Sequence, residues 1–137
     1  MANAPYPSFL QALGEGSIDL SAGTFKISLL DSGIYTPDVT DGGDDFYDDI
    51  SAAELTVATL TATWTLRVFD ASDFVGTFPD PGGGDTGEYL VIWKDTGVAA
   101  TSPLLFFFDT LSGLPMTLDG TADSLTFNAS GIWKLGA

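Results

Sequence analysis

Apolar and polar residues alternate over long stretches of this chain, which is the pattern of a β-strand with one buried and one solvated face. Every second residue is apolar in 24–29 and again in 60–68, so we expect a strand in each. Leu55 and Val57 fall on the opposite parity from 60–68. Because a shift of one residue turns a strand over, we expect a bulge, a bend or a separate strand around 58–59.

Two further segments, 89–94 and 104–108, are apolar on both parities. Strands of this kind are covered on both faces, so we place these two at the centre of the fold. The turn residues at 95–97 start a short connection between them, which suits a hairpin. Later strands are expected at 116–118, 124–127 and 132–135. The pattern predicts a mainly β fold, an antiparallel β-sandwich or barrel.

One helical pattern precedes the strands. Ser8 and Gln11 have the spacing of a capping box, Phe9 lies on the apolar side, and Gly14 is expected to end the helix. We therefore expect a short N-terminal helix attached to a single β domain that spans 1–137.

Composition excludes several kinds of chemistry. The chain has no histidine or cysteine, and it carries 19 acidic residues against 4 basic ones. Sites of the Ser-His-Asp, Cys-His and zinc types are therefore ruled out. The formal charge of −15 opposes binding to nucleic acid and to anionic membranes. A carboxylate glycosidase is the remaining enzyme class, but the few basic residues could hardly tune a catalytic pair, so we expect no enzymatic activity.

An acidic segment at 36–49 combines aspartates with glycine. Its six carboxylates repel one another and need either water or a hard cation, so two interpretations stay open: a solvated loop and a calcium site. The spacing is not that of an EF-hand. The calcium candidates are Asp41, Asp44, Asp45, Asp48 and Asp49; no other cofactor is expected.

A second interruption, 78–87, is rich in proline and glycine. It lacks the Gly-Lys-Ser or Gly-Lys-Thr ending of a phosphate loop, and it lies between strand patterns rather than before a helix. We therefore expect an exposed loop or a contact surface.

Aromatic residues fall within the strand patterns, where a core role is expected. They are Trp64, Trp93, Trp133 and 106–108. A sugar-stacking platform is the alternative for the tryptophans. The aromatic strands also offer more apolar surface than one modest sandwich hides, which favours subunit contacts. The interface candidates are Tyr6, Phe9, Phe106 and Phe108.

In several segments the chain resembles small virion proteins encoded by tailed bacteriophages. Residues 1–38 resemble a helix, an Ile-Asp-Leu turn and a strand ending in Leu-Leu-Asp-Ser-Gly-x-Tyr. Segment 45–50 resembles the Asp-Phe-x-Asp-Asp-Ile element of these proteins, 91–97 their hydrophobic strand before Asp-Thr-Gly, and 110–115 their Thr-x-x-Gly-Leu-Pro turn. None of these motifs is catalytic. The chain departs from the pattern at 79–84, a loop that is usually shorter.

This resemblance implies a structural component of the phage particle. We expect a capsid decoration or cement protein on the outside of the head, with the major capsid protein or other virion proteins as partners and a homo-oligomer, a trimer, as its state. Segment 1–7 could serve as an arm laid on the shell, or it could be a disordered terminus. Synthesis is expected in the host cytoplasm, because the N-terminal sequence has no secretion-signal pattern.

Two other functions stay open. A tail, neck or fibre-base component would suit the same acidic β domain. A carbohydrate-binding module would use exposed tryptophan or tyrosine rings on a sheet face.

Overall fold

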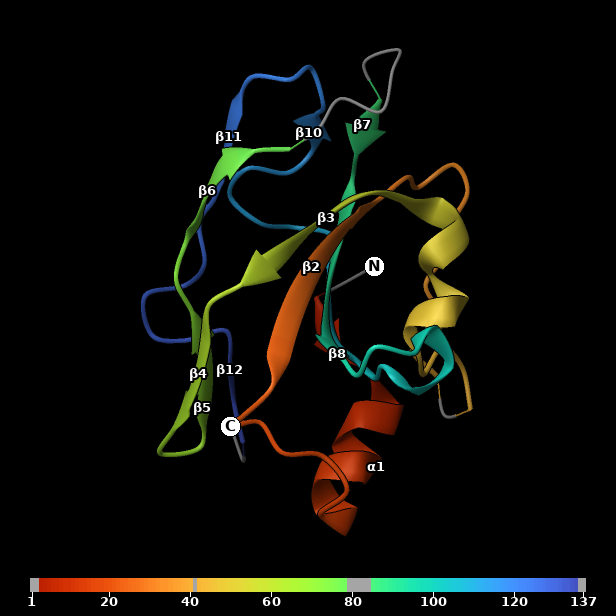
Figure 1. The fold of residues 1–137 in the computed structure, drawn as a ribbon, viewed down its shortest axis with the longest axis vertical. Helices are drawn as coiled ribbons and strands as arrows, with labels where there is room; N and C mark the ends of the chain where they lie inside the picture. Colours follow the sequence, from red (N-terminus) through yellow and green to blue (C-terminus); the bar gives the residue numbers. More distant parts are fainter. Residues whose placement is uncertain (1–2, 41, 79–84, 136–137) are drawn as a thin grey trace.

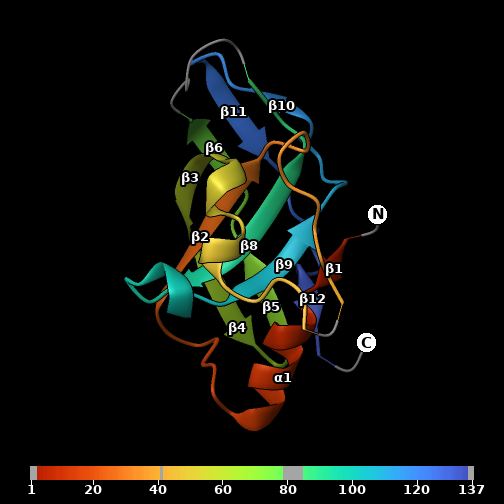
Figure 2. The ribbon, with the colours of Figure 1, turned by 90° about the vertical axis from the view of Figure 1, so that its right-hand side faces the viewer.

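The computed structural model describes residues 3–40, 42–78 and 85–135. Its main element is a five-stranded antiparallel sheet, drawn in Figure 1 and seen from the side in Figure 2, where its strands follow one another from β3 on the left to β1 on the right. The strands in spatial order are β1 (Ala4–Pro5), β9 (Leu104–Phe108), β8 (Tyr89–Asp95), β2 (Thr24–Leu30) and β3 (Glu54–Leu60).

Shorter strands form a second layer against one face of this sheet (Figure 1). They comprise a three-stranded sheet of β12 (Trp133–Lys134), β5 (Val68–Ala71) and β4 (Ala62–Thr65), and a pair of β11 (Ala122–Leu125) and β6 (Phe74–Thr77). A further pair, β10 (Met116–Thr117) and β7 (Thr86–Gly87), closes one end. The fold is therefore mainly β, antiparallel and sandwich-like, as predicted.

Aromatic rings fill the space between the two layers. Phe69 of β5 lies 5.4 Å from Phe25 of β2 and 5.2 Å from Phe106 of β9, centroid to centroid. All three are buried. The inward positions of the period-two strands thus make one core, as their alternation predicts.

The predicted N-terminal helix is present with different ends. Helix α1 spans Pro7–Glu15, and Tyr6 rather than Ser8 is its N-cap, with proline in the first turn. It continues past Gly14 and ends at Gly16, whose φ of +73° is the left-handed conformation that glycine adopts at low cost. Phe9 is its buried residue.

The single strand expected over 60–68 is wrong. Strand β3 runs through 58–59 without a break and ends at Leu60; β4 and β5 follow as a hairpin. Thr65 pairs with Val68, so Leu66 and Arg67 form a two-residue loop. Alternation alone could not reveal this turn, because the loop contains neither glycine nor asparagine.

The other long strands agree with the pattern. Strands β8 and β9 form the expected hairpin, and β8 lies in the middle of the main sheet. Of the later strands, β10 and β12 fall inside the expected ranges, whereas β11 begins at Ala122, two residues before the expected start.

The N-terminal segment does not form a free arm in the described part, which starts at residue 3. Ala4 and Pro5 pair with Phe107 and Phe106 at the edge of the main sheet. The side chain of Asn3 accepts hydrogen bonds from the backbone N–H groups of Asp109 and Thr110 and donates one to the carbonyl of Thr110. The chain itself thus occupies the edge of β9.

Candidate functional site: a polar and aromatic groove

The most developed side-chain cluster lies on the outer face of the main sheet. Phe25, Ile27 and Leu29 of β2 point into the core, so Lys26 and Ser28 between them point outward. Lys26 is paired in register with Trp93 of β8, which shares this face. Two one-turn 3₁₀ helices, η1 (Tyr47–Asp49) and η2 (Ser51–Ala53), lead into β3 beside it.

Ser28 is fully buried and lies at the centre of a hydrogen-bond network. Its hydroxyl donates to Glu54 Oε2 and accepts from Trp93 Nε1 at 2.8 Å. The hydroxyl of Tyr47 donates to Glu54 Oε1 at 2.9 Å, and the Tyr47 ring stacks on Trp93 with 4.1 Å between centroids. The network thus joins residues of four elements, β2, β3, β8 and η1, and fixes the position of the aromatic ring pair.

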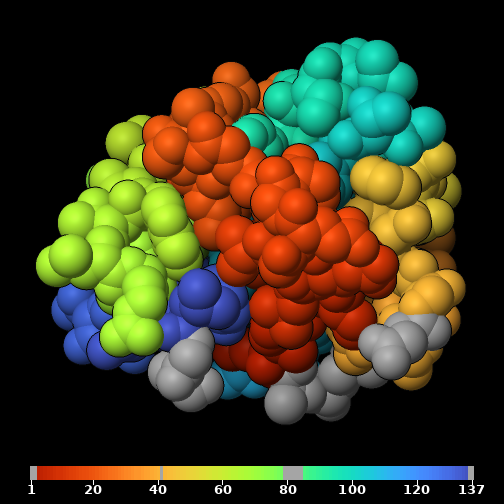
Figure 3. Space-filling view, turned by 90° about the horizontal axis from the view of Figure 1, so that it is seen from below, coloured from red at the N-terminus to blue at the C-terminus, as the bar shows by residue number. Residues whose placement is uncertain are grey.

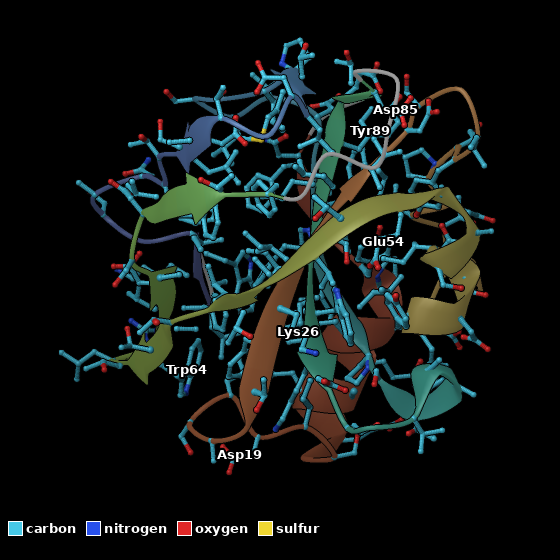
Figure 4. The ribbon with its side chains drawn as sticks, turned by 45° about the horizontal axis from the view of Figure 1, so that its top comes forward. Asp19, Lys26, Glu54, Trp64, Asp85 and Tyr89 are labelled. Carbon is cyan, nitrogen blue, oxygen red and sulfur yellow. The ribbon has the colours of Figure 1, made fainter. Side chains whose placement is uncertain are left out.

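A groove of about 280 Å³ runs beside this ring pair. Val57 of β3 and Val98, before the 3₁₀ helix η3 (Ala99–Thr101), are 40% and 57% exposed and contribute apolar walls. Lys26 and Asp95 form an ion pair of 2.9 Å within it. In Figure 4 the side chains of Lys26 and Glu54 are labelled on the same side of the β3 ribbon, while Trp64 lies to their left, on β4.

The environment of the groove shifts two pKa values. The hydrogen bond from Lys26, together with one from the backbone N–H of Gly97, holds the pKa of Asp95 below its ordinary value. Burial, the hydrogen bond to Glu54 and the charge of that carboxylate raise the pKa of Tyr47 to about 12. Near neutral pH the groove thus holds a lysine paired with a carboxylate and a neutral phenol, which suits recognition rather than proton transfer.

The acidic segment turns several of its carboxylates toward its own backbone. Asp49 accepts hydrogen bonds from the N–H groups of Asp45 and Phe46 at 2.9 and 3.2 Å. Although partial burial acts the other way, these bonds hold the pKa of Asp49 below its ordinary value, whereas burial and the nearby carboxylates raise that of Asp45. Asp48 is exposed, and its carboxylate makes no hydrogen bond within the described residues.

Asp44, a second calcium candidate, accepts a hydrogen bond from the backbone N–H of Asp38 and another from the hydroxyl of Tyr35. Tyr35 in turn contacts the hydroxyl of Tyr6 at 3.0 Å. Burial raises the pKa of both tyrosines. This chain of groups ties the acidic segment to the N-terminus of α1.

In the described part of the chain, no three carboxylates come together in an arrangement that could hold a metal ion. The acidic segment therefore shows no assembled set of calcium ligands there. Asp44 and Asp49 have backbone donors as partners, whereas the carboxylate of Asp48 makes no hydrogen bond within the described residues. Asp41 lies outside the described residues.

The interface candidates are corrected by the structure. Tyr6 and Phe9 are 0% exposed, Phe106 is 3% and Phe108 is 9% exposed. They pack within the chain, for example Phe9 against Phe106 at 5.2 Å, so their side chains offer no surface to a partner. The aromatic strands are covered by the second layer, by Phe9 of α1 and by the segment around Tyr35, which the sequence interpretation underestimated.

The tryptophans divide into two groups. Trp93 is buried, as predicted, whereas Trp64 and Trp133 are half-buried and stack at 6.4 Å. In the Pro/Gly segment, residues 79–84 lie outside the described residues; Phe78 before them is buried.

Sequence reasoning missed Ser28, Tyr47 and Glu54. Ser28 looked like an ordinary polar position of an alternating strand, and Tyr47 and Glu54 lay in or beside the acidic segment. The available signal was the combination of an outward serine with a tyrosine and a glutamate before the next strand, but only strand register brings the three together.

Comparisons with known proteins give no relative. No family model, no curated protein and no solved structure matches this chain. No helix in the described ranges combines the length and apolarity needed to cross a bilayer.

Proposed function

We propose that this protein is a structural component of a tailed-bacteriophage virion and that it decorates the outside of the head in many copies. The proposal rests on the segments that resemble phage virion proteins. Three of them coincide with structural landmarks: 91–97 with β8 and the turn after it, 110–115 with the turn after β9, and 45–50 with η1 and the residues around it. The likeness thus falls on a strand, on turns and on a 3₁₀ helix rather than on a catalytic motif.

The charge distribution supports an outer location. With 19 acidic and 4 basic residues, the protein repels DNA and stays soluble at the high local concentration of a repeated surface subunit. Asp19, Asp38 and Asp119 each accept hydrogen bonds from a serine or threonine two residues on, in exposed turns. The exposed carboxylates thus stabilise the scaffold and solvate its surface, and the proposed role needs no catalysis.

Copy number in purified particles tests this proposal. Quantitative mass spectrometry against the major capsid protein should give hundreds of copies per particle for a head decoration protein, whereas tens or fewer would place the chain in the tail, neck or fibre base. Absence from the particle would contradict a virion role altogether.

A carbohydrate-binding module is a second candidate, favoured by the half-buried Trp64 and Trp133 rings of β4 and β12, which stack on each other. A glycan array tests it. Binding that is lost in Trp64→Ala and kept in Val75→Ala, a variant of an exposed apolar residue on β6, would support this function; an array without any binder would remove it.

A further inference from the structure

The β4–β5 hairpin ends in an unfavourable loop. Leu66 and Arg67 both have positive φ, +51° and +70°, which is the signature of a type I′ turn. Such turns prefer Asn-Gly or Gly-Gly, because a side chain in the left-handed region costs roughly 1–2 kcal/mol. Leu66 is also 87% exposed. A strained turn with an exposed leucine does not stabilise the fold, so a contact with another molecule explains it better.

The same tip carries uncompensated positive charge. Of the four basic residues, Lys26 is paired with Asp95, and Lys94 donates to the carbonyl of Asp19. Arg67 and Lys134 are exposed, and neither side chain makes an ion pair or a hydrogen bond within residues 3–40, 42–78 and 85–135.

These two cations lie together with two leucines. Lys134 pairs with Val68, the N–H of Leu135 donates to the carbonyl of Arg67 at 2.9 Å, and Leu135 is 40% exposed. In Figure 3, which shows the molecule from below, the yellow-green hairpin lies beside the blue segment that contains β12. We refer to Leu66, Arg67, Lys134 and Leu135 as the hairpin pole.

The groove has the complementary properties. Its apolar walls, Val57 and Val98, are exposed, and the stacked rings of Tyr47 and Trp93 line it as well. Asp48 follows the groove residue Tyr47 directly in η1; it is exposed, and its carboxylate makes no hydrogen bond within the described residues. A leucine would find apolar and aromatic contacts in the groove, and an adjacent arginine would find the unpaired carboxylate of Asp48.

One chain cannot bring its own pole to its own groove. The groove lies on the outer face of β2 and β8, whereas β5 packs against the opposite, inner face through Phe69 and Phe25. The pole therefore has to reach the groove of another molecule. Copies that carry a charge of −15 each repel one another. The positive side chains of the pole, in contrast, are attracted to the carboxylates of another copy.

We infer that the hairpin pole of one copy docks into the groove of a second copy. Leu66 packs between the valines and on Tyr47, and Arg67 and Lys134 lie against Asp48 of η1. Because the two surfaces differ, the contact is head-to-tail, and it closes into a ring if the rotation between copies permits. The inference concerns the purified chain and does not depend on a location in the virion.

Cross-linking tests the contact directly. The natural chain has no cysteine, so a mixture of Leu66→Cys and Val98→Cys variants can form a mixed disulfide only between molecules. The control mixture pairs Leu66→Cys with Val75→Cys, at a position that is 77% exposed but remote from the groove. We expect mild oxidation to give a mixed dimer about tenfold faster with Val98→Cys. Equal rates in the two mixtures, or no mixed dimer, would overturn the inference.

A turn variant separates contact from stability. Leu66→Asn with Arg67→Gly installs the preferred type I′ sequence, so the melting temperature should rise, while the dissociation constant for self-association, measured by sedimentation velocity, should increase at least about tenfold. A variant that is more stable and associates as tightly as the natural chain would refute the docking of the pole. A natural chain that stays monomeric at every soluble concentration would do the same.

A charge-matched pair completes the test. Arg67→Ala with Lys134→Ala lowers the net charge by two, and so does Ser72→Asp with Ser124→Asp, at exposed positions outside the pole and the groove. Only the first pair should abolish association. Equal weakening by both would show that overall charge, not the pole, controls association.

Discussion

At the scale of single residues, the hydrogen-bond network around Ser28 is the arrangement that depends most on every partner being present. A buried hydroxyl without partners is costly, and here one hydroxyl connects Trp93 and Glu54 across two neighbouring strands. Because Glu54 also holds Tyr47, the serine indirectly shapes the groove.

Ser28→Ala should therefore destabilise the fold by about 1–3 kcal/mol, since the indole N–H and one carboxylate oxygen lose their buried partner. Urea unfolding measures the loss. Thr59→Ala on β3 is the matched control, because Thr59 is exposed on the neighbouring strand, and it should change stability little. Equal effects of the two substitutions would contradict the central role of Ser28.

Tyr47 gives a pH-dependent prediction. Its pKa is raised from 10.0 to about 12 by burial and by Glu54. A raised pKa in the folded state means that the protonated phenol contributes stability that is fully present below the unfolded value and is lost as pH rises through the folded one. The melting temperature should therefore fall between about pH 10 and pH 12.

Tyr47→Phe should flatten this alkaline decline, while its melting temperature at pH 7 is lower because the hydrogen bond to Glu54 is gone. Thermal scans of both proteins across the alkaline range provide the measurement. Parallel declines would mean that Tyr47 is not among the groups responsible; Tyr6 and Tyr35, whose pKa values are also raised by burial, would then account for the decline.

At the scale of elements, strands with a clear alternation were predictable and the turn chemistry was not. The alternation in β2 and the doubly apolar β8 and β9 determine their own position, because burial selects the register. The β4–β5 hairpin escaped prediction since its loop uses Leu66 and Arg67 in a conformation that their side chains disfavour. The residue preference of two-residue hairpin loops is thus not met at the site for which we infer a contact.

The N-terminal strand shows a second limit. A short segment with two prolines and small residues gives no strand signal, and its pairing with β9 depends on a partner about a hundred residues away in the sequence. The groove was beyond prediction for the same reason, because Ser28, Tyr47 and Trp93 meet only through the strand order.

Asn3→Ala should loosen this edge. The side chain makes three hydrogen bonds to the backbone of 109–110, and their loss from an exposed site should cost about 1–2 kcal/mol. Amide exchange of Tyr6, whose N–H donates to the carbonyl of Leu105, should accelerate before global unfolding. Unchanged exchange at Tyr6 would indicate that β1 is held by strand pairing alone.

At the scale of the whole molecule, charge governs behaviour. A net charge of −15 on a 14.3 kDa chain creates self-repulsion that salt screens, since the Debye length shrinks from about 30 Å at 0.01 M to about 10 Å at 0.1 M. Sodium chloride should thus raise the melting temperature over this range. This rise in melting temperature results from the summed charge of the carboxylates rather than from any one of them.

Two adjacent aspartates separate this overall effect from local bonding. Asp48 and Asp49 carry the same charge and are both exposed, but only Asp49 accepts backbone hydrogen bonds, from Asp45 and Phe46.

At 0.01 M salt Asp48→Asn should raise the melting temperature because it reduces repulsion, and this gain should shrink at about 0.5 M salt. Asp49→Asn should lower the melting temperature at both salt concentrations, because a neutral amide accepts these bonds less strongly. Thermal scans of the two variants at each salt concentration decide the matter: a gain in both variants would mean that overall charge outweighs the bonds within the acidic segment, and a loss in both would mean that Asp48 has a stabilising contact of its own.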